Sequence, residues 1–249
     1  SFLGTNEAGV FTVGMYFATL IEIPRRSVVG IIQPVLADSF KNEDYVQIDS
    51  LYKKSSLNLL LIGGVIFILV WINIDEIFQL IPRNEDFITG VPVVFFYGLS
   101  RVIDLGTGCN QEILTFSKHY KINFLFTFLL VGVVILTNLI FIPKYGITGA
   151  ALATCVSIAV HNILRYIYLL VKMKIQPFVF KSLIVLIVLI LFFMLGEFLQ
   201  LNISPILSII IKSVIICFPL LIVVYFLRIS SEINIFLNNL FNKFKKSNF

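Results

Sequence analysis

Charged side chains are scarce in this chain. Only 13% of its 249 residues are Asp, Glu, Lys or Arg, whereas soluble proteins carry about 25%. Hydrophobic residues make up 58% of the sequence, and the mean hydropathy is +0.98. This composition excludes an ordinary water-soluble domain. A net charge of +5 would suit a nucleic-acid partner, but the placement of the basic residues points to a membrane surface.

Residues that carry chemistry are also few. The chain has two histidines and no Gly-x-Ser-x-Gly, His-Glu-x-x-His, phosphate-loop or Cys/His ligand pattern. Its three cysteines, Cys109, Cys155 and Cys217, lie in apolar stretches without metal-ligand spacing, so we interpret them as small apolar packing residues. We therefore expect a protein that is not an enzyme and that binds neither a metal nor a cofactor.

Long apolar stretches occupy most of the chain. Each is long enough to cross a bilayer, which takes about 20 mostly apolar residues. We therefore predict an all-α integral membrane protein with seven transmembrane helices. The stretches cover residues 8–37, 55–76, 89–115, 122–142, 147–171, 182–200 and 205–228.

Basic residues between these stretches alternate in abundance. If Ser1 lies outside, the inward segments contain twelve Lys and Arg, whereas the outward segments contain only Arg83 and Lys144. Cationic loops resist translocation, so this asymmetry predicts a cytoplasmic C-terminus. The inward residues are Lys41, Lys53, Lys54, Lys118, Lys121, Lys172, Lys174, Lys181, Arg228, Lys243, Lys245 and Lys246.

The pattern divides the chain into three parts. Residues 1–171 hold five predicted spans and residues 172–228 hold two more. Residues 229–249 form a predicted amphipathic helix at the inner surface, since their apolar residues recur at helical spacing. An odd number of spans that begins outside, without a basic segment in residues 1–8, leads us to expect an additional N-terminal lobe in the complete protein.

Glu22, Arg25 and Arg26 are the first candidate site residues. Spacings of three and four place Glu22 on the same helix face as both arginines. A charge at the bilayer centre costs about 3 kcal/mol or more, so we favour a face directed at a water-filled cavity. Guanidinium groups there match the geometry of phosphate oxygens. The arginines extending to the inner surface, or forming a purely structural pair, remain as alternatives.

Arg101, Asp104 and Asn110 form a second polar run, in the stretch 89–115. Arg101 and Asp104 are three residues apart and are predicted to pair on one helix. Asp104 and Asn110 are candidate residues for cation coupling. The slightly favoured alternative is hydrogen bonding between helices, with the inner end of the span near Glu112.

Two other cations lie within apolar stretches, Arg165 and Lys212. Each is close enough to a span end for its long side chain to reach a membrane surface, and that is the location we predict. His161, four residues before Arg165, is predicted to be a hydrogen-bonding core residue, with a proton relay as the alternative.

Three segments carry a resemblance to a known family. Residues 142–166 contain Pro143 and Gly146 at a predicted outer turn, followed by small residues at four-residue spacing that allow close helix packing. The segments Phe-Leu-Gly-Thr-Asn-Glu-Ala-Gly-Val-Phe (2–11), with Pro-Val-Leu-Ala at 34–37, and Gly-Cys-Asn-Gln-Glu-Ile-Leu (108–114) agree. Together they resemble the C-terminal half of bacterial polysaccharide or O-antigen flippases, in the multidrug/oligosaccharidyl-lipid/polysaccharide exporter superfamily.

The resemblance implies a fold and a function. It implies the C-terminal lobe of a two-lobed, MATE-like transporter in the bacterial inner membrane, with a V-shaped cavity completed by the other lobe. The implied substrate is an undecaprenyl-pyrophosphate-linked oligosaccharide, moved by alternating access for polysaccharide or lipopolysaccharide biosynthesis. Glycan polymerase machinery is an implied partner. By position, Arg25 or Arg26 is the implied cavity arginine, and we expect both to hold the pyrophosphate with Glu22 orienting them.

Other classes fit the composition less well. A cation-coupled multidrug exporter of the same superfamily would favour acidic and aromatic residues in its cavity, since its substrates are cationic. A membrane glycan polymerase or acyltransferase would need a catalytic cluster or a large outer loop, and a scaffold would not need several charges within its spans.

Overall fold

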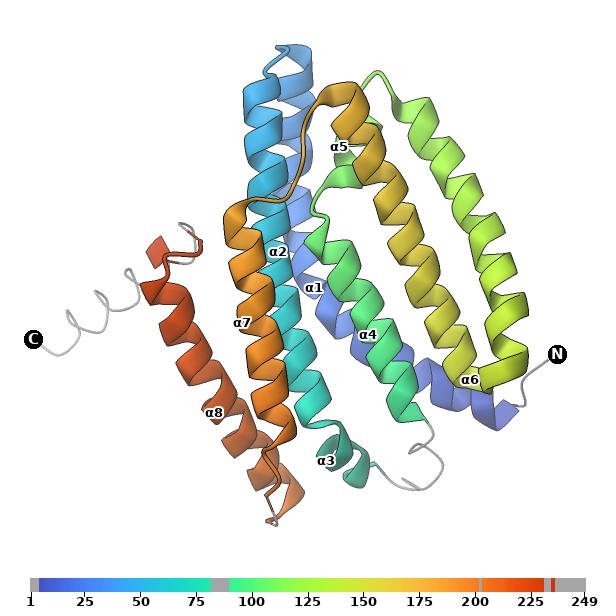
Figure 1. Ribbon diagram of the computed structural model, residues 1–249, viewed down its shortest axis with the longest axis vertical. Helices are drawn as coiled ribbons and strands as arrows, with labels where there is room; N and C mark the ends of the chain where they lie inside the picture. Colours follow the sequence, from blue (N-terminus) through green and yellow to red (C-terminus); the bar gives the residue numbers. More distant parts are fainter. Residues whose placement is uncertain (1–4, 82–89, 202, 231–233, 236–249) are drawn as a thin grey trace, which may run out of the picture.

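The computed structural model describes residues 5–81, 90–201, 203–230 and 234–235, and within them every regular element is an α-helix. The helices lie roughly side by side and form an elongated bundle (Figure 1). In chain order they are α1 (Thr5–Lys41), α2 (Tyr45–Ile72), α3 (Ile74–Gln79), α4 (Val91–Gly106), α5 (Asn110–Phe116), α6 (Tyr120–Met173), α7 (Phe180–Glu197) and α8 (Pro205–Phe226).

The centre of the bundle is α2, which packs against α1, α4 and α7. This helix is strongly apolar and two-thirds buried along its most apolar segment. Gly63 lies against Leu105 of α4, and Gly64 lies against Leu189 of α7, so tightly that a Cβ at either glycine would overlap these side chains. The two adjacent glycines therefore allow two helices to approach α2 closely.

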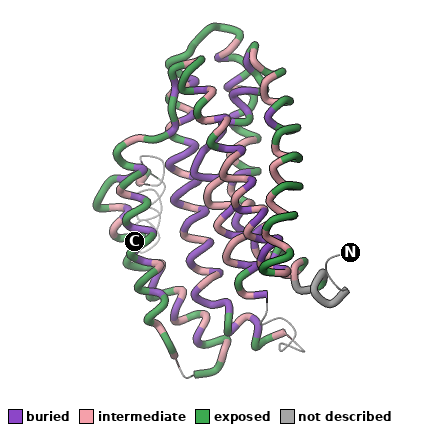
Figure 2. Tube along the Cα trace, turned by 45° about the vertical axis from the view of Figure 1, so that its right-hand side comes forward, coloured by how far each residue is buried: buried purple, intermediate pink, exposed green. Residues whose placement is uncertain are grey.

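Helix α6 is bent into a hairpin. Its backbone leaves helical geometry at Gly146 (φ 55°, ψ −131°), three residues after Pro143, and the two arms run side by side in opposite directions (Figure 1). The hydroxyl groups of Thr137 and Ser157 are 2.9 Å apart across the hairpin. The first arm is exposed or half-buried except at Phe126 (Figure 2).

Among the residues that the structure describes, four helices are long and apolar enough to cross a membrane: α2, α6, α7 and α8. The structure therefore does not confirm the prediction of seven transmembrane helices. The 54 residues of α6 combine the predicted stretches 122–142 and 147–171, α4 has only 16 residues, and α1 carries charged residues near its middle. The helices indicate a membrane-embedded, all-α protein, as predicted from the composition.

The basic segments gather at one end of the bundle. The turn between α1 and α2, the connection between α5 and α6, and the end of α6 line one pocket. These are three of the four segments predicted to face inward. The bend of α6 and the α7–α8 connection lie at the opposite end (Figure 1). The predicted helix at 229–249 falls almost entirely outside the described residues.

Substitution of Gly149 tests the α6 hairpin. A Cβ at Gly149 would lie 2.2 Å from the carbonyl oxygen of Phe141 in the other arm, whereas a Cβ at Gly132 meets no atom within 4 Å. Because backbone cannot yield as a flexible side chain does, Gly149→Ala should lower the free energy of unfolding by about 1–3 kcal/mol.

Gly132→Ala is the matched control, and we expect it to raise the stability by up to about 1 kcal/mol, as for an exposed helical glycine. Unfolding of the purified protein in detergent measures both changes. Equal stability of the two variants would show that the arms are not in this close contact.

Candidate functional site

A group of buried and half-buried polar residues lies where α1, α4, α5 and the second arm of α6 meet. Its members come from segments far apart in the chain and are joined by direct hydrogen bonds and ion pairs. We call it the inner polar cluster. It consists of Arg25, Asp104, Thr107, Asn110, Glu112 and Asn162.

Arg25 is the central residue of this cluster and is only 8% exposed. Its Nη1 atom lies 2.5 Å from Oδ2 of Asp104, and its Nη2 atom lies 3.2 Å from Oε1 of Glu112. One guanidinium group on α1 therefore bridges two carboxylates, one on α4 and one on α5. Pairing of this kind offsets the cost of removing the charges from water.

Asn162 joins the second arm of α6 to the same cluster. Its Nδ2 atom donates to Oδ1 of Asp104 at 2.9 Å, so that both oxygens of this carboxylate accept hydrogen bonds. The Oδ1 atom of Asn162 accepts from Thr107 Oγ1 and from Asn110 Nδ2, each at 2.8 Å. A single amide thus fixes three side chains around the break between α4 and α5.

The break itself requires glycine. Residues 107–109 separate α4 from α5, and Gly108 has φ 64°. A Cβ there would lie 2.8 Å from the backbone nitrogen of Ser56 in α2. Only glycine combines this left-handed conformation with such close contact. Because the helix restarts at Asn110, Asp104 and Glu112 are brought to the same guanidinium.

The ion pairs cross between helices in a way that the sequence did not predict. Glu22 pairs with Arg101 of α4 at 3.3 Å, and Asp104 pairs with Arg25. The predictions that Glu22 pairs with the arginines of its own helix and that Arg101 pairs with Asp104 are therefore wrong. Proline at position 24 and close packing of α1 on α4 favour partners on the neighbouring helix over partners one turn away.

Arg26 has a different environment from Arg25. It is exposed on α1, together with the neighbouring Ser27 and with Gln33, and it forms no ion pair among the described residues. Adjacent helical residues point about 100° apart, so one arginine enters the bundle while the next lies on its surface.

The outer faces of α7 and α8 are different in character from this face of α1. Within these two helices, the exposed residues between the end turns are all apolar, such as Leu186, Ile190, Ile210 and Phe218. Such faces suit contact with lipid tails. The exposed surface of α1 is mixed, because Arg26, Ser27 and Gln33 lie among exposed Leu20, Ile23 and Ile31. A guanidinium group there suits contact with water or with another part of a protein.

Asp104 and Asn110, the candidate cation-coupling residues, do lie together, because both contact Asn162. Asn110 is fully buried. Within the described residues, no group of three or more His, Cys, Asp or Glu side chains is arranged to hold a metal ion. Cation coupling at Asp104 and Asn110 stays a prediction.

Two buried cations were assigned to the membrane surfaces from the sequence, and both assignments are wrong. Arg165 is 4% exposed and donates to Gln111 of α5. Lys212 is 7% exposed, pairs with Glu76 of α3, and also donates to the carbonyl oxygen of Ile72. In both cases the partner comes from a distant segment, so spacing along the chain did not reveal it.

Comparison with known proteins gives no relative: no family model, no curated protein and no solved structure matches this chain. The chemistry of its site therefore rests on the residues themselves.

Replacing Arg25 tests the inner polar cluster. Arg25→Gln leaves the buried carboxylate of Glu112 and the half-buried carboxylate of Asp104 without their cation, so we expect a loss of about 3–5 kcal/mol in the free energy of unfolding. Arg26→Gln removes the same charge from an exposed position and should change the stability by less than about 0.5 kcal/mol. Denaturant titration of the two purified variants compares them. A similar loss in both would contradict the buried bridge.

Proposed function

We propose that this chain is the C-terminal lobe of a flippase that moves an undecaprenyl-pyrophosphate-linked oligosaccharide across the bacterial inner membrane. The resemblance of residues 2–11, 108–114 and 142–166 supports this function, and the membrane-embedded helical bundle agrees with it. In this proposal α1, α4 with α5, and the two arms of α6 supply crossings besides those of α2, α7 and α8. The basic end of the bundle faces the cytoplasm.

The observation that carries the proposal is the exposed position of Arg26 on the surface of α1. A guanidinium near the middle of a membrane helix is too costly to leave among lipid tails, and Arg26 has no acidic partner among the described residues. Free donors of this kind bind the oxygen atoms of a diphosphate with good geometry. In the proposed transporter, this face of α1 borders the cavity between the two lobes, and Arg26 contacts the pyrophosphate.

Arg25 and Glu22 have supporting roles in this proposal. Arg25 donates to Asp104 and Glu112, and Glu22 accepts from Arg101, so both residues hold α1 against α4 and α5. Their contacts fix the direction in which Arg26 points. A binding residue held on a rigid helix loses less entropy when substrate binds, and this is the advantage that the cluster provides.

Alternating access requires the lobes to move as units. The inner polar cluster joins four helices within this lobe, and its charges are paired internally, so rocking of the lobe would break none of these contacts. Asp104 is the candidate for coupling this motion to a cation.

The test replaces Arg26 in the complete protein in its own bacterium. Arg26→Gln should reduce surface polysaccharide at least tenfold at normal protein level, because the interaction with the diphosphate is lost, and Arg26→Lys should retain part of it. Lys144→Gln removes an exposed cation beside the α6 bend and serves as the control, with normal output. Binding of undecaprenyl pyrophosphate to the purified variants should fall in parallel. Normal polysaccharide from Arg26→Gln would reject the proposal.

A further inference from the structure

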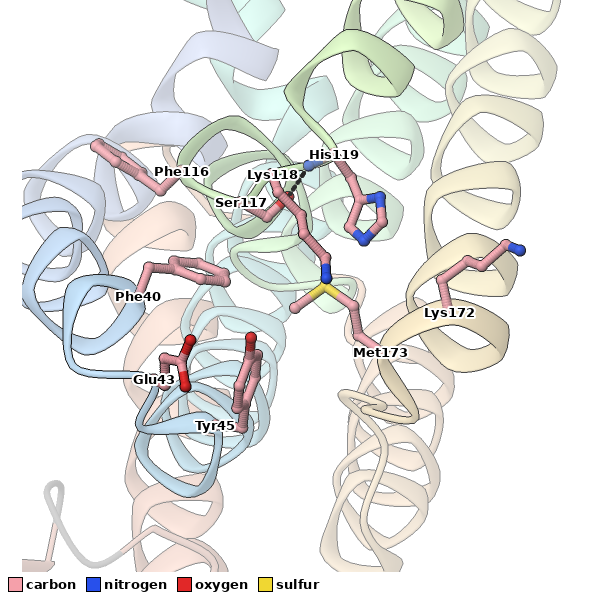
Figure 3. A pocket seen from close by; sticks show the side chains of 9 residues that line it. All are labelled: Phe40, Glu43, Tyr45, Phe116, Ser117, Lys118, His119, Lys172 and Met173. Atoms are coloured by element: carbon pink, nitrogen blue, oxygen red, sulfur yellow. Dashed lines mark hydrogen bonds between the residues drawn. The ribbon is translucent and has the colours of Figure 1, made fainter.

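A pocket of about 510 Å³ opens at the basic end of the bundle, away from the inner polar cluster. The α1–α2 turn, the α5–α6 connection and the end of α6 form its walls. Its volume is within the range of small-molecule sites. Figure 3 shows its lining residues, which are Phe40, Glu43, Tyr45, Phe116, Ser117, Lys118, His119, Lys172 and Met173.

Charges of opposite sign stand on different sides of this pocket. Lys118 reaches into it from the α5–α6 connection, while Glu43 and Tyr45 stand on the side formed by the α1–α2 turn (Figure 3). Lys172 extends away from the other side chains. Within the described residues, neither Glu43 nor Lys118 forms an ion pair. Both charges are therefore available to a ligand.

The walls are held in place by the protein. The hydroxyl group of Ser117 accepts from the backbone nitrogen of His119, and Nδ1 of His119 lies 2.9 Å from the hydroxyl group of Tyr168. On the opposite side, Glu43 has φ 55° in the short turn that joins α1 to α2. Two well-fixed connections therefore carry the positive and the negative group.

A zwitterionic ligand matches this arrangement. A phosphate group accepts hydrogen bonds from Lys118, and a primary ammonium group donates to the carboxylate of Glu43. The rings of Phe40 and Tyr45, next to Glu43 in the pocket wall, favour a cation on that side. A simple anion would have no positive group to contact the carboxylate of Glu43.

Exposed aromatic side chains follow the pocket along the first arm of α6. Phe116 lines the pocket, and Tyr120, Phe124 and Phe128 follow at four-residue spacing, all exposed. The rings of Phe124 and Phe128 are 4.8 Å apart. Tyr120, Phe124 and Phe128 all belong to α6, where residues four apart share one face, so these three rings form a stripe that offers a surface for acyl chains whose headgroup occupies the pocket.

We propose that this pocket binds the headgroup of an aminophospholipid, with Lys118 at the phosphate and Glu43 at the primary ammonium group. Basic pockets between membrane helices are suited to lipid headgroups, and the acidic side of this one selects phosphoethanolamine. The site anchors the basic end of the lobe to its leaflet. It does not depend on the substrate that is transported.

The test titrates the purified protein, in a maltoside detergent, with dihexanoyl phosphatidylethanolamine and its phosphatidylcholine and phosphatidylglycerol counterparts. We expect the dissociation constant to be at least tenfold lower for phosphatidylethanolamine, since the quaternary ammonium of choline cannot donate and glycerol carries no charge. Glu43→Gln should remove this preference. Lys118→Gln should raise the dissociation constant about tenfold, and Tyr45→Phe, which removes one hydroxyl group, should raise it less.

Lys121→Gln is the matched control, because it removes an equal charge from the first turn of α6, outside the pocket lining. It should change the dissociation constant less than twofold. Equal affinity for the three lipids, or equal effects of Lys118→Gln and Lys121→Gln, would overturn the proposal. Soluble phosphoethanolamine or inorganic phosphate binding as tightly as the lipid would also overturn it, since the acyl chains would then contribute nothing.

Discussion

The bridge from Arg25 to Asp104 and Glu112 is the interaction on which the rest of the site depends. It joins α1 to α4 and α5, and Asn162 extends it to α6. Three charges in such a place are costly unless they are paired and hydrogen-bonded. Pairing fixes the position of α1 along α4, because any shift of one helix along the other would separate the charges. Apolar contacts between the same helices would tolerate such a shift.

The bridge also explains how the adjacent Arg25 and Arg26 come to have different environments. The direction of Arg25 is set by its two carboxylates, and helical geometry then places Arg26 on the outer face of α1. The exposed faces of α7 and α8 carry only apolar residues between their end turns, so the position of Arg26 is unusual for this molecule. A buried structural arginine and an exposed arginine, which we propose contacts the substrate, are thus two results of one packing arrangement.

The bend of α6 forms one end of the bundle, and the basic connections between helices form the other. At one end, Gly146 reverses α6, and Gly149 lets its two arms touch. At the other end, three basic connections meet around one pocket. The basic residues that predict the orientation of the chain are therefore also close together in space. Among them, Lys118 faces Glu43 from a different side of the pocket. Lys118 thus belongs both to the charge pattern that predicts topology and to the proposed headgroup site.

Composition and charge pattern by themselves determined that this is a membrane-embedded helical protein, because scarce charge and long apolar stretches leave few other folds. They also located Arg25, Asp104 and Asn110 as unusual residues, since charges and polar runs within apolar stretches need partners. Only the tertiary structure decided which residues are those partners. Glu22 pairs with Arg101, and Lys212 pairs with Glu76. Asn162 forms hydrogen bonds with both Asp104 and Asn110. The physical reason is that spacing predicts neighbours within one helix, whereas a buried charge is satisfied by whichever helix packs against it.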